Sequence, residues 1–154
     1  MTILKVSERD LLFALASRLP GTSHFLDLKS GEVIPVFSYN RETILAQVKQ
    51  APDRFLRLAP LSGRQGYEIM ERFTATVSRP ELRQRLTAAL KDEHAFRQFQ
   101  AVLKEFPAEY QRWRQFRTFL MVQGVRDRLE PLGIELELVP EPGKPKGDHD
   151  SGPI

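Results

Sequence analysis

The sequence predicts an α+β fold with about six helices and a small, mostly antiparallel sheet. Three observations lead to this prediction. Several helix-start signals are followed by apolar residues at helical spacing. Two apolar runs near the N-terminus flank a turn, which is typical of a β-hairpin. Residues 134–139 alternate apolar and acidic side chains, as a half-buried strand does.

Two helices are predicted in the first sixty residues. Ser7 favours a helix start because a serine hydroxyl can accept a hydrogen bond from a backbone N–H of the first turn. Asp10 then lies near the positive end of the helix dipole. We expect this helix to cover residues 8–18. Asn40 is a second capping residue and predicts a helix over 41–50.

The predicted sheet begins with a hairpin over residues 24–36. Gly31 is available for the positive φ that a short turn requires. Pro35 cannot donate to a strand ladder and places the second strand at an edge. Residues 55–58 form a short middle strand. Closing the sheet requires the C-terminal strand to return to the hairpin.

Three more helices are predicted in the middle of the chain. Ser62 with Gln65, and Ser78 with Glu81, are capping-box patterns. Asp92 is predicted to cap a third helix. The apolar stripes predicted to be buried are Tyr67, Met70, Phe73, Thr74 and Val77, then Leu82, Leu86 and Leu90, then Phe96, Phe99, Leu103 and Phe106.

The longest helix is predicted over residues 107–130, ending before Gly133. The chain after the last strand is rich in Pro and Gly and has no aromatic residue. Such a segment buries too little apolar surface to become ordered. The sequence therefore predicts one α+β domain over 1–139 and a disordered tail over 140–154.

Composition excludes several classes of site. The chain has no cysteine, which rules out disulfides, thiolate nucleophiles and cysteine-based zinc or iron–sulfur sites. No run of about 20 apolar residues exists, and the N-terminal segment lacks the pattern of a signal peptide. The sequence predicts a soluble, cytoplasmic protein without a membrane partner.

Metal ligands and nucleophiles show no strong pattern. His24, His94 and His149 are far apart in the sequence. Asp92-Glu93-His94 contains possible ligands, but adjacent helical residues point about 100° apart and chelate poorly. Asp148-His149-Asp150 lies in the predicted tail and could hold a metal only weakly. No metal and no cofactor is predicted.

A carboxylate pair is the remaining route to catalysis. Glu68 and Glu71 share a predicted helix face, and Asp27 lies in the hairpin. A hydrolase would need two of these acids to converge in a pocket. Arg64 and Arg72 lie four residues from Glu68 on either side, so a solvated ion-pair face is the default interpretation.

A basic side of the last two predicted helices is the strongest candidate for a functional surface. Arginines with an interleaved tyrosine can grip phosphates and stack on a base. In the alternative interpretation, Tyr110 and Met121 are core, and the arginine stems cover apolar surface with their charges in water. The candidate contact residues are Arg97, Lys104, Tyr110, Arg114, Arg117 and Arg128.

The sequence also resembles a known family, on motifs that occur in a fixed order over roughly residues 8–137. These are Phe25-Leu-Asp-Leu-Lys-Ser-Gly-Glu-Val33, Arg54 to Pro60 with Leu61-Ser62, Tyr67, Met70, Glu71, Phe73, Ala89-Leu90, Ala95-Phe96-Arg97-Gln98-Phe99, Trp113 and Phe116. They are similar to an uncharacterised bacterial family, number zero-one-five-eight of the UPF series. That family has no assigned activity, so the resemblance implies a domain and no chemistry.

The sequence departs from this family's pattern around the fifth predicted helix. The family tends to have a glycine after Ala-Leu-x, where this chain has Asp92 and Glu93 after Lys91. Gln98 and Gln100 stand where the family tends to have basic residues. The resemblance therefore does not imply a basic cluster at this helix.

The leading functional prediction is a non-catalytic binding or regulatory domain with a protein or small ligand as its partner. The sequence favours a protein that is not an enzyme. The first alternative is a nucleic-acid-binding protein that uses the basic helical face. The second is a carboxylate-based hydrolase. Oligomeric state stays open.

Overall fold

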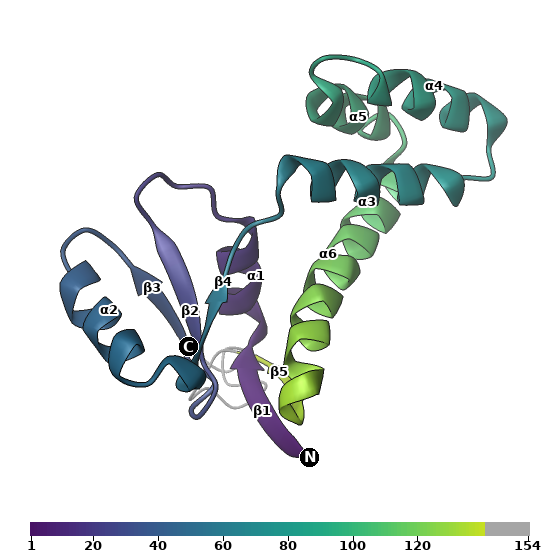
Figure 1. Ribbon diagram of the computed structural model, residues 1–154. Coiled ribbons are helices and arrows are strands. Elements are labelled where there is room, and N and C mark those ends of the chain that lie inside the picture. Colours follow the sequence, from purple (N-terminus) through teal and green to yellow (C-terminus); the bar gives the residue numbers. More distant parts are fainter. Residues whose placement is uncertain (141–154) are drawn as a thin grey trace, which may run out of the picture. The chain divides into compact units, whose positions relative to one another are not determined.

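The computed structural model describes residues 1–140, so the predicted tail lies outside the described residues except for Pro140. The described chain forms two compact units. Unit 1 consists of residues 1–60 and the segment from Gly124 onward, and unit 2 of Leu61–Gln123. That residues 1–139 act as one domain stays a prediction. The six predicted helices are present (Figure 1).

Unit 1 contains two small sheets, two helices and the last turns of the longest helix, α6 (Pro107–Leu129), which begins in unit 2. In chain order the elements of unit 1 are β1 (Thr2–Ser7), α1 (Glu8–Ala16), β2 (Ser23–Asp27), β3 (Val33–Val36), α2 (Arg41–Gln50), the 3-10 turn η1 (Pro52–Arg54), β4 (Phe55–Leu58), the end of α6, the 3-10 turn η2 (Glu130–Leu132) and β5 (Ile134–Val139).

The predicted hairpin and middle strand form an antiparallel sheet with strand order β3-β2-β4. Leu26 of β2 pairs with Val33 of β3 and with Leu56 of β4. Pro35 lies on β3, an edge strand of this sheet, as predicted. Gly31 in the turn has φ +83°, which confirms its predicted role. The antiparallel part of the predicted sheet is therefore correct.

The prediction that the C-terminal strand joins the hairpin is wrong. β5 pairs in parallel with β1, with Leu4 opposite Leu136, in a separate two-stranded sheet. No strand had been predicted before Ser7. The hairpin offers β5 a poor edge, because β2 already has two neighbours and Pro35 on β3 cannot donate. β1 instead offers buried Leu4 and Val6, which face the core with Leu136.

The helix starts follow the predictions in part. Ser7 Oγ accepts a hydrogen bond from the N–H of Asp10, as expected for the cap of α1. Asn40 lies at the start of α2, but its side chain bonds the backbone of Pro35 and Phe37 instead of capping the helix. α2 is confirmed, and its start depends on contacts outside the helix.

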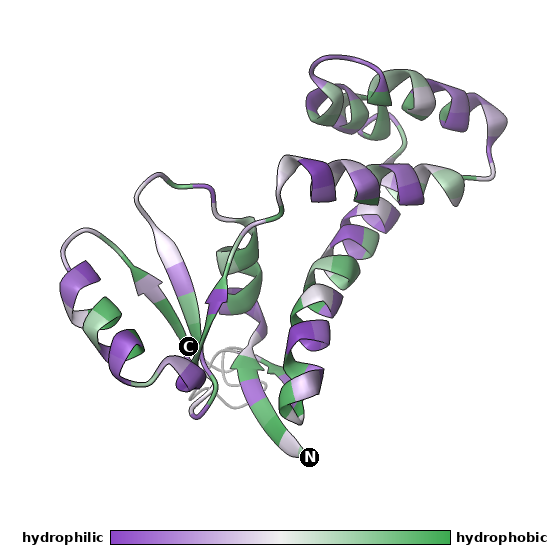
Figure 2. Cartoon of the chain, viewed as in Figure 1, coloured by the Kyte–Doolittle hydropathy of each residue, from purple (hydrophilic) through white to green (hydrophobic). Residues whose placement is uncertain are grey.

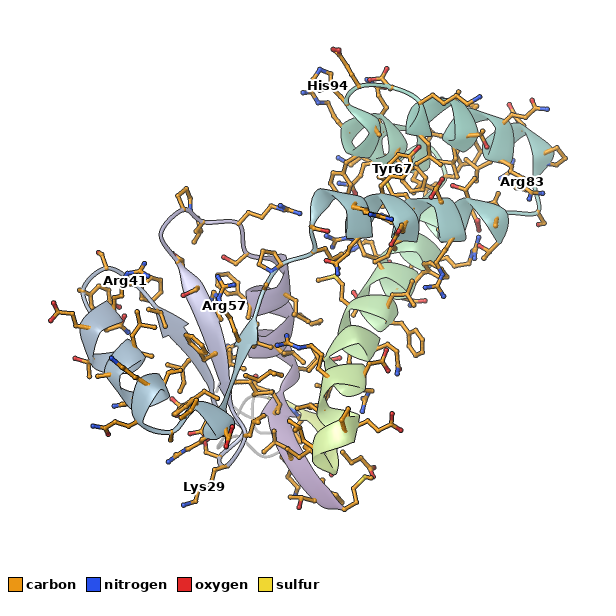
Figure 3. The ribbon with its side chains drawn as sticks, viewed as in Figure 1. Lys29, Arg41, Arg57, Tyr67, Arg83 and His94 are labelled. Atoms are coloured by element: carbon orange, nitrogen blue, oxygen red, sulfur yellow. The ribbon has the colours of Figure 1, made fainter. Side chains whose placement is uncertain are left out.

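Unit 2 is helical and packs around an aromatic centre. Phe73, Phe99 and Trp113 are buried and meet edge to face, with ring centroids 5.0 to 6.4 Å apart. Tyr67 lies at the rim of this core (Figure 3), and its hydroxyl donates to the carbonyl of Leu90. The elements of unit 2 are α3 (Gly63–Ala75), α4 (Pro80–Leu90), α5 (Ala95–Leu103) and the first part of α6.

Of the two capping boxes predicted in unit 2, one forms. Ser62 Oγ accepts from the N–H of Gln65, and the Gln65 amide oxygen accepts from the N–H of Ser62. The second box, at Ser78, is wrong because α4 has Arg79 at its N-cap and no side-chain capping bond. Pro at the first position, whose missing N–H costs nothing there, starts α4 instead. The predicted cap of α5 is also wrong, because His94 is the N-cap and Asp92 accepts the N–H of His94 outside the helix.

One residue predicted to be core is exposed. Phe96 keeps 47% of its surface accessible, whereas Phe99 and Leu103 of the same helix are fully buried. The helical position of Phe96 does not predict this exposure. Phe96 precedes the buried Leu103 by seven residues, so the two side chains point within about 20° of each other around the helix axis. The ring lies 5.9 Å from the guanidinium of Arg117 on α6, a helix that mixes hydrophobic and hydrophilic residues along its length (Figure 2).

Candidate functional site

Positive charge is concentrated in unit 2. Residues 61–123 contain eleven lysines and arginines against seven aspartates and glutamates, a net charge of +4. The rest of the chain contains twelve basic and thirteen acidic residues, a net charge of −1. The mildly basic character of the whole chain therefore comes from the helical unit alone.

Two acidic residues of unit 2 that are sequence neighbours of predicted contact residues have partners elsewhere. Glu105 forms an ion pair with Arg85 at 2.8 Å, and Glu109 with Arg112 at 2.8 Å. In each case the hydrogen bond from the arginine lowers the pKa of the glutamate. These two acids are thus neutralised by arginines outside the predicted contact set.

Two contacts align α5 with the first part of α6. The hydroxyl of Tyr110 lies 3.4 Å from the side-chain oxygen of Gln100, to which it donates. The guanidinium of Arg117 lies 5.9 Å from the centre of the Phe96 ring. The earlier residue of α5, Phe96, contacts the later residue of α6, Arg117, and the later residue Gln100 contacts the earlier residue Tyr110. The two helices therefore run in opposite directions along this flank.

The predicted cations lie beside these contacts. Arg114 is exposed on α6, and helical spacing puts it on the flank of Tyr110 and Arg117. Arg97 and Lys104 are exposed and seven residues apart, so they share the side of α5 next to Gln100. We call this surface the α5/α6 face; it consists of Phe96, Arg97, Gln100, Lys104, Tyr110, Arg114 and Arg117.

The α5/α6 face carries unneutralised charge. Arg97, Lys104 and Arg114 form no ion pair within the part of the chain that the structure describes. Arg117 is half-buried beside the exposed ring of Phe96. A surface that combines free cations with an accessible aromatic ring can hold phosphates and a planar base together.

Sequence reasoning missed two members of this face, Phe96 and Gln100. The sequence pattern predicts Phe96 in the core, and Gln100 stands where the family tends to have a basic residue. Phe96 and Gln100 belong to the face because they contact Arg117 and Tyr110 of α6. No local sequence pattern shows these contacts. Tyr110 is half-buried, so its predicted alternative as part of the core is also partly correct.

Arg128, the sixth predicted contact residue, belongs to unit 1. Its guanidinium donates to the carbonyl of Arg57 on the edge strand β4, at 2.8 Å. Arg126 makes a similar bond to the carbonyl of Leu136 on β5, at 2.5 Å. The last turn of α6 thus uses its arginines to hold two strands of unit 1.

The acids of the hydrolase hypothesis have other partners. The carboxylate of Asp27 accepts two hydrogen bonds from Arg54 and two from backbone N–H groups of the hairpin turn. Glu68 forms an exposed ion pair with Arg64 at 3.5 Å, as the default interpretation expected. Glu71 is exposed on α3. We therefore build no hydrolytic site on these residues.

The histidines lie in different surroundings. His24 is buried against Phe13, and burial lowers the pKa of its imidazole. His94 projects from the loop before α5 (Figure 3), 3.5 Å from the carboxylate of Glu93. Within residues 1–140, no group of three or more His, Cys, Asp or Glu side chains could hold a metal ion. The predicted ligand triplet at His149 lies outside the described residues.

No helix within residues 1–140 combines the length and the apolar composition needed to cross a bilayer.

Comparison with known proteins places the chain in a family. The model of the uncharacterised protein family UPF0158 matches residues 1–130. A relative from Pseudomonas aeruginosa strain PAO1, named UPF0158 protein PA5073, is 32% identical over 144 residues, which cover 88% of this chain and 93% of the relative. No solved structure matches the chain. With most of its length matched by the family model, this chain belongs to the uncharacterised protein family UPF0158.

Proposed function

We propose that this protein is a non-catalytic binding protein and that its α5/α6 face holds single-stranded nucleic acid. The observation that carries the proposal is that one helical hairpin has both an accessible aromatic ring and three exposed cations that form no ion pair within residues 1–140. The cations are Arg97, Lys104 and Arg114, and the ring is that of Phe96.

Phosphate binding supplies the affinity in this proposal. Each cation that neutralises a phosphate releases condensed counterions, so the binding constant falls as salt rises. Concentration of the positive charge in unit 2 raises the local potential and speeds the encounter with a polyanion. Unit 1, with its net charge of −1, does not contribute to this attraction.

The preference for a single strand rests on Phe96. Unpaired bases can stack on an exposed aromatic side chain, and such stacking contributes about 1–3 kcal/mol per base. Bases inside a duplex are stacked on each other and cannot reach the ring. Arg117 lies over the Phe96 ring and holds it in place from the α6 side.

Fluorescence anisotropy tests the proposal. A labelled single strand of about 20 nucleotides, as RNA and as DNA, and the matching duplex are titrated between about 50 and 200 mM salt. We expect binding of the single strand, with a slope of log affinity against log salt that becomes shallower by about 2 in the triple variant Arg97→Gln, Lys104→Gln, Arg114→Gln.

A matched control removes the same charge from other surfaces. Lys29, Lys49 and Arg83 are exposed and lie on the hairpin turn, α2 and α4; Figure 3 labels Lys29 and Arg83. The control variant Lys29→Gln, Lys49→Gln, Arg83→Gln is expected to keep most of the affinity. Equal losses in both variants, or no retention of any single strand at the lowest salt, would exclude the proposal.

The variant Phe96→Ala separates stacking from charge. It leaves every cation in place, so we expect weaker binding of the single strand with an unchanged salt slope. An affinity that does not respond to this change would contradict the role of Phe96. If only the duplex binds, the surface recognises phosphates without reading unpaired bases, and the single-strand proposal fails.

A further inference from the structure

Unit 1 contains a cavity of about 320 Å³ beside the carboxyl ends of its two parallel strands. Ser7 ends β1 and Val139 ends β5; the two residues are paired in register, and both line the cavity. In parallel α/β sheets, ligands bind beyond the carboxyl ends of the strands. The volume lies within the range of about 300–1,000 Å³ that is usual for small-molecule sites.

The walls of the cavity are fixed by backbone contacts. β1 passes the hairpin turn so closely that a Cβ on Gly31 would overlap the carbonyl oxygen of Lys5. Asp27 holds the same turn through the N–H groups of Lys29 and Ser30. Ser7, the last residue of β1, accepts the N–H of Asp10 and so joins the strand to the first turn of α1. A cavity held in this way loses little conformational entropy when a ligand enters it.

Residues of opposite charge are among those that line the cavity. They are Lys5, whose side chain ends in an ammonium group, and Glu32 and Asp10, whose side chains end in carboxylates. Within residues 1–140, Lys5 forms no ion pair, either with Glu32 or with its strand neighbour Glu137. Asp10 forms an ion pair with exposed Arg9, at 3.2 Å.

We propose that this cavity binds a small zwitterion, namely an α-amino acid with an aliphatic side chain. Its carboxylate would pair with Lys5 and its ammonium group with Glu32 and Asp10, which makes each hydrogen bond charge-assisted. Val33 and Val139 supply apolar lining for the aliphatic side chain. This site lies in unit 1 and is independent of the α5/α6 face.

Isothermal titration calorimetry with three related compounds tests the charge pattern. Leucine carries both charges, isopentylamine lacks the carboxylate, and 4-methylpentanoate lacks the ammonium group. We expect leucine to bind, and each single-charge compound to bind at least about tenfold more weakly. Equal binding of 4-methylpentanoate would indicate a simple anion site and would overturn the zwitterion assignment.

Two variants test which residue binds each charged group of the ligand. Lys5→Met is expected to weaken leucine by about tenfold and to leave isopentylamine unchanged, since that compound has no carboxylate. Glu32→Gln is expected to weaken leucine and to leave 4-methylpentanoate unchanged. Lys49→Met and Glu42→Gln, on exposed positions of α2, are the matched controls.

Urea unfolding of each variant identifies any loss that comes from a damaged fold. If the wild-type protein shows no binding of leucine or valine up to about 10 mM, the cavity is not an amino-acid site. The same conclusion follows if Lys5→Met and Glu32→Gln bind leucine as well as the two control variants do.

Discussion

Arg54 donates two hydrogen bonds to the carboxylate of Asp27, at 2.9 and 2.8 Å, and so connects the end of η1 to the hairpin turn. Asp27 is almost completely buried, whereas about half of the Arg54 side chain is accessible. The same carboxylate accepts the N–H groups of Lys29 and Ser30. Four donors thus converge on one buried acid at the point where three strands of unit 1 meet.

Substitution of Asp27 by alanine should destabilise unit 1 by about 2–3 kcal/mol. The variant leaves the turn N–H groups of Lys29 and Ser30 without their acceptor. Arg54→Met should cost less, because solvent screens the half-exposed guanidinium and the turn keeps its bonds to Asp27. Urea unfolding of both variants measures this order. An equal or larger loss in Arg54→Met would show that the ion pair, and not the turn, dominates.

Asp27 should also make the stability depend on pH. The hydrogen bonds from Arg54, with those from the turn, hold the pKa of this carboxyl well below its usual range. The stabilisation is therefore complete above the unfolded-state pKa of about 3.9 and is lost as the pH falls through lower values. Unfolding free energies at several pH values should show the gap between wild type and Asp27→Asn narrowing below about pH 4. A constant gap would contradict the lowered pKa.

Gly31→Ala should destabilise the protein more than Gly21→Ala does. Both glycines have positive φ, +83° and +73°, and both substitutions incur the backbone strain of about 1 kcal/mol. Only at Gly31 would the new Cβ also overlap a backbone atom, the carbonyl oxygen of Lys5, whereas the space around Gly21 is open. Thermal unfolding of the two variants checks the difference. Equal changes in Tm would mean that β1 can move away from the turn.

Ser62→Ala should destabilise unit 2 by about 1 kcal/mol, and Ser78→Ala by less than about 0.5 kcal/mol. Both serines stand in the same sequence pattern, but only Ser62 accepts a capping hydrogen bond, from the N–H of Gln65. Helical circular dichroism during urea unfolding reports the change. A larger effect at Ser78 would show that α4 begins differently from the structure described here.

The helices were predictable because their signals are local. A capping serine, a proline at the first position and apolar residues every three or four positions act within a few residues of each other. α6 therefore begins at the predicted Pro107 and ends within one residue of the prediction. α2 also has its predicted bounds, although the Asn40 side chain does not cap it. The hairpin was predictable for the same reason, since Gly31 and the two apolar runs are neighbours in the chain.

The candidate surface was predictable in part. Arg97 lies on α5, Lys104 directly follows the last residue of that helix, and Arg114 and Arg117 lie on α6. Arg128 is on the same helix, but its partner on β4 is 71 residues away in the chain, and no local pattern shows that contact.

The sequence by itself determined which segments form helices, the antiparallel hairpin and the basic character of the last two helices. Only the tertiary structure decided that β5 pairs with β1, that the positive charge is concentrated in unit 2, and that a cavity with opposite charges lies beside Ser7 and Val139. The physical reason is the range of the interactions. Hydrogen bonds of caps and turns join residues a few positions apart, whereas strand pairing and cavities join segments more than a hundred residues apart in this chain.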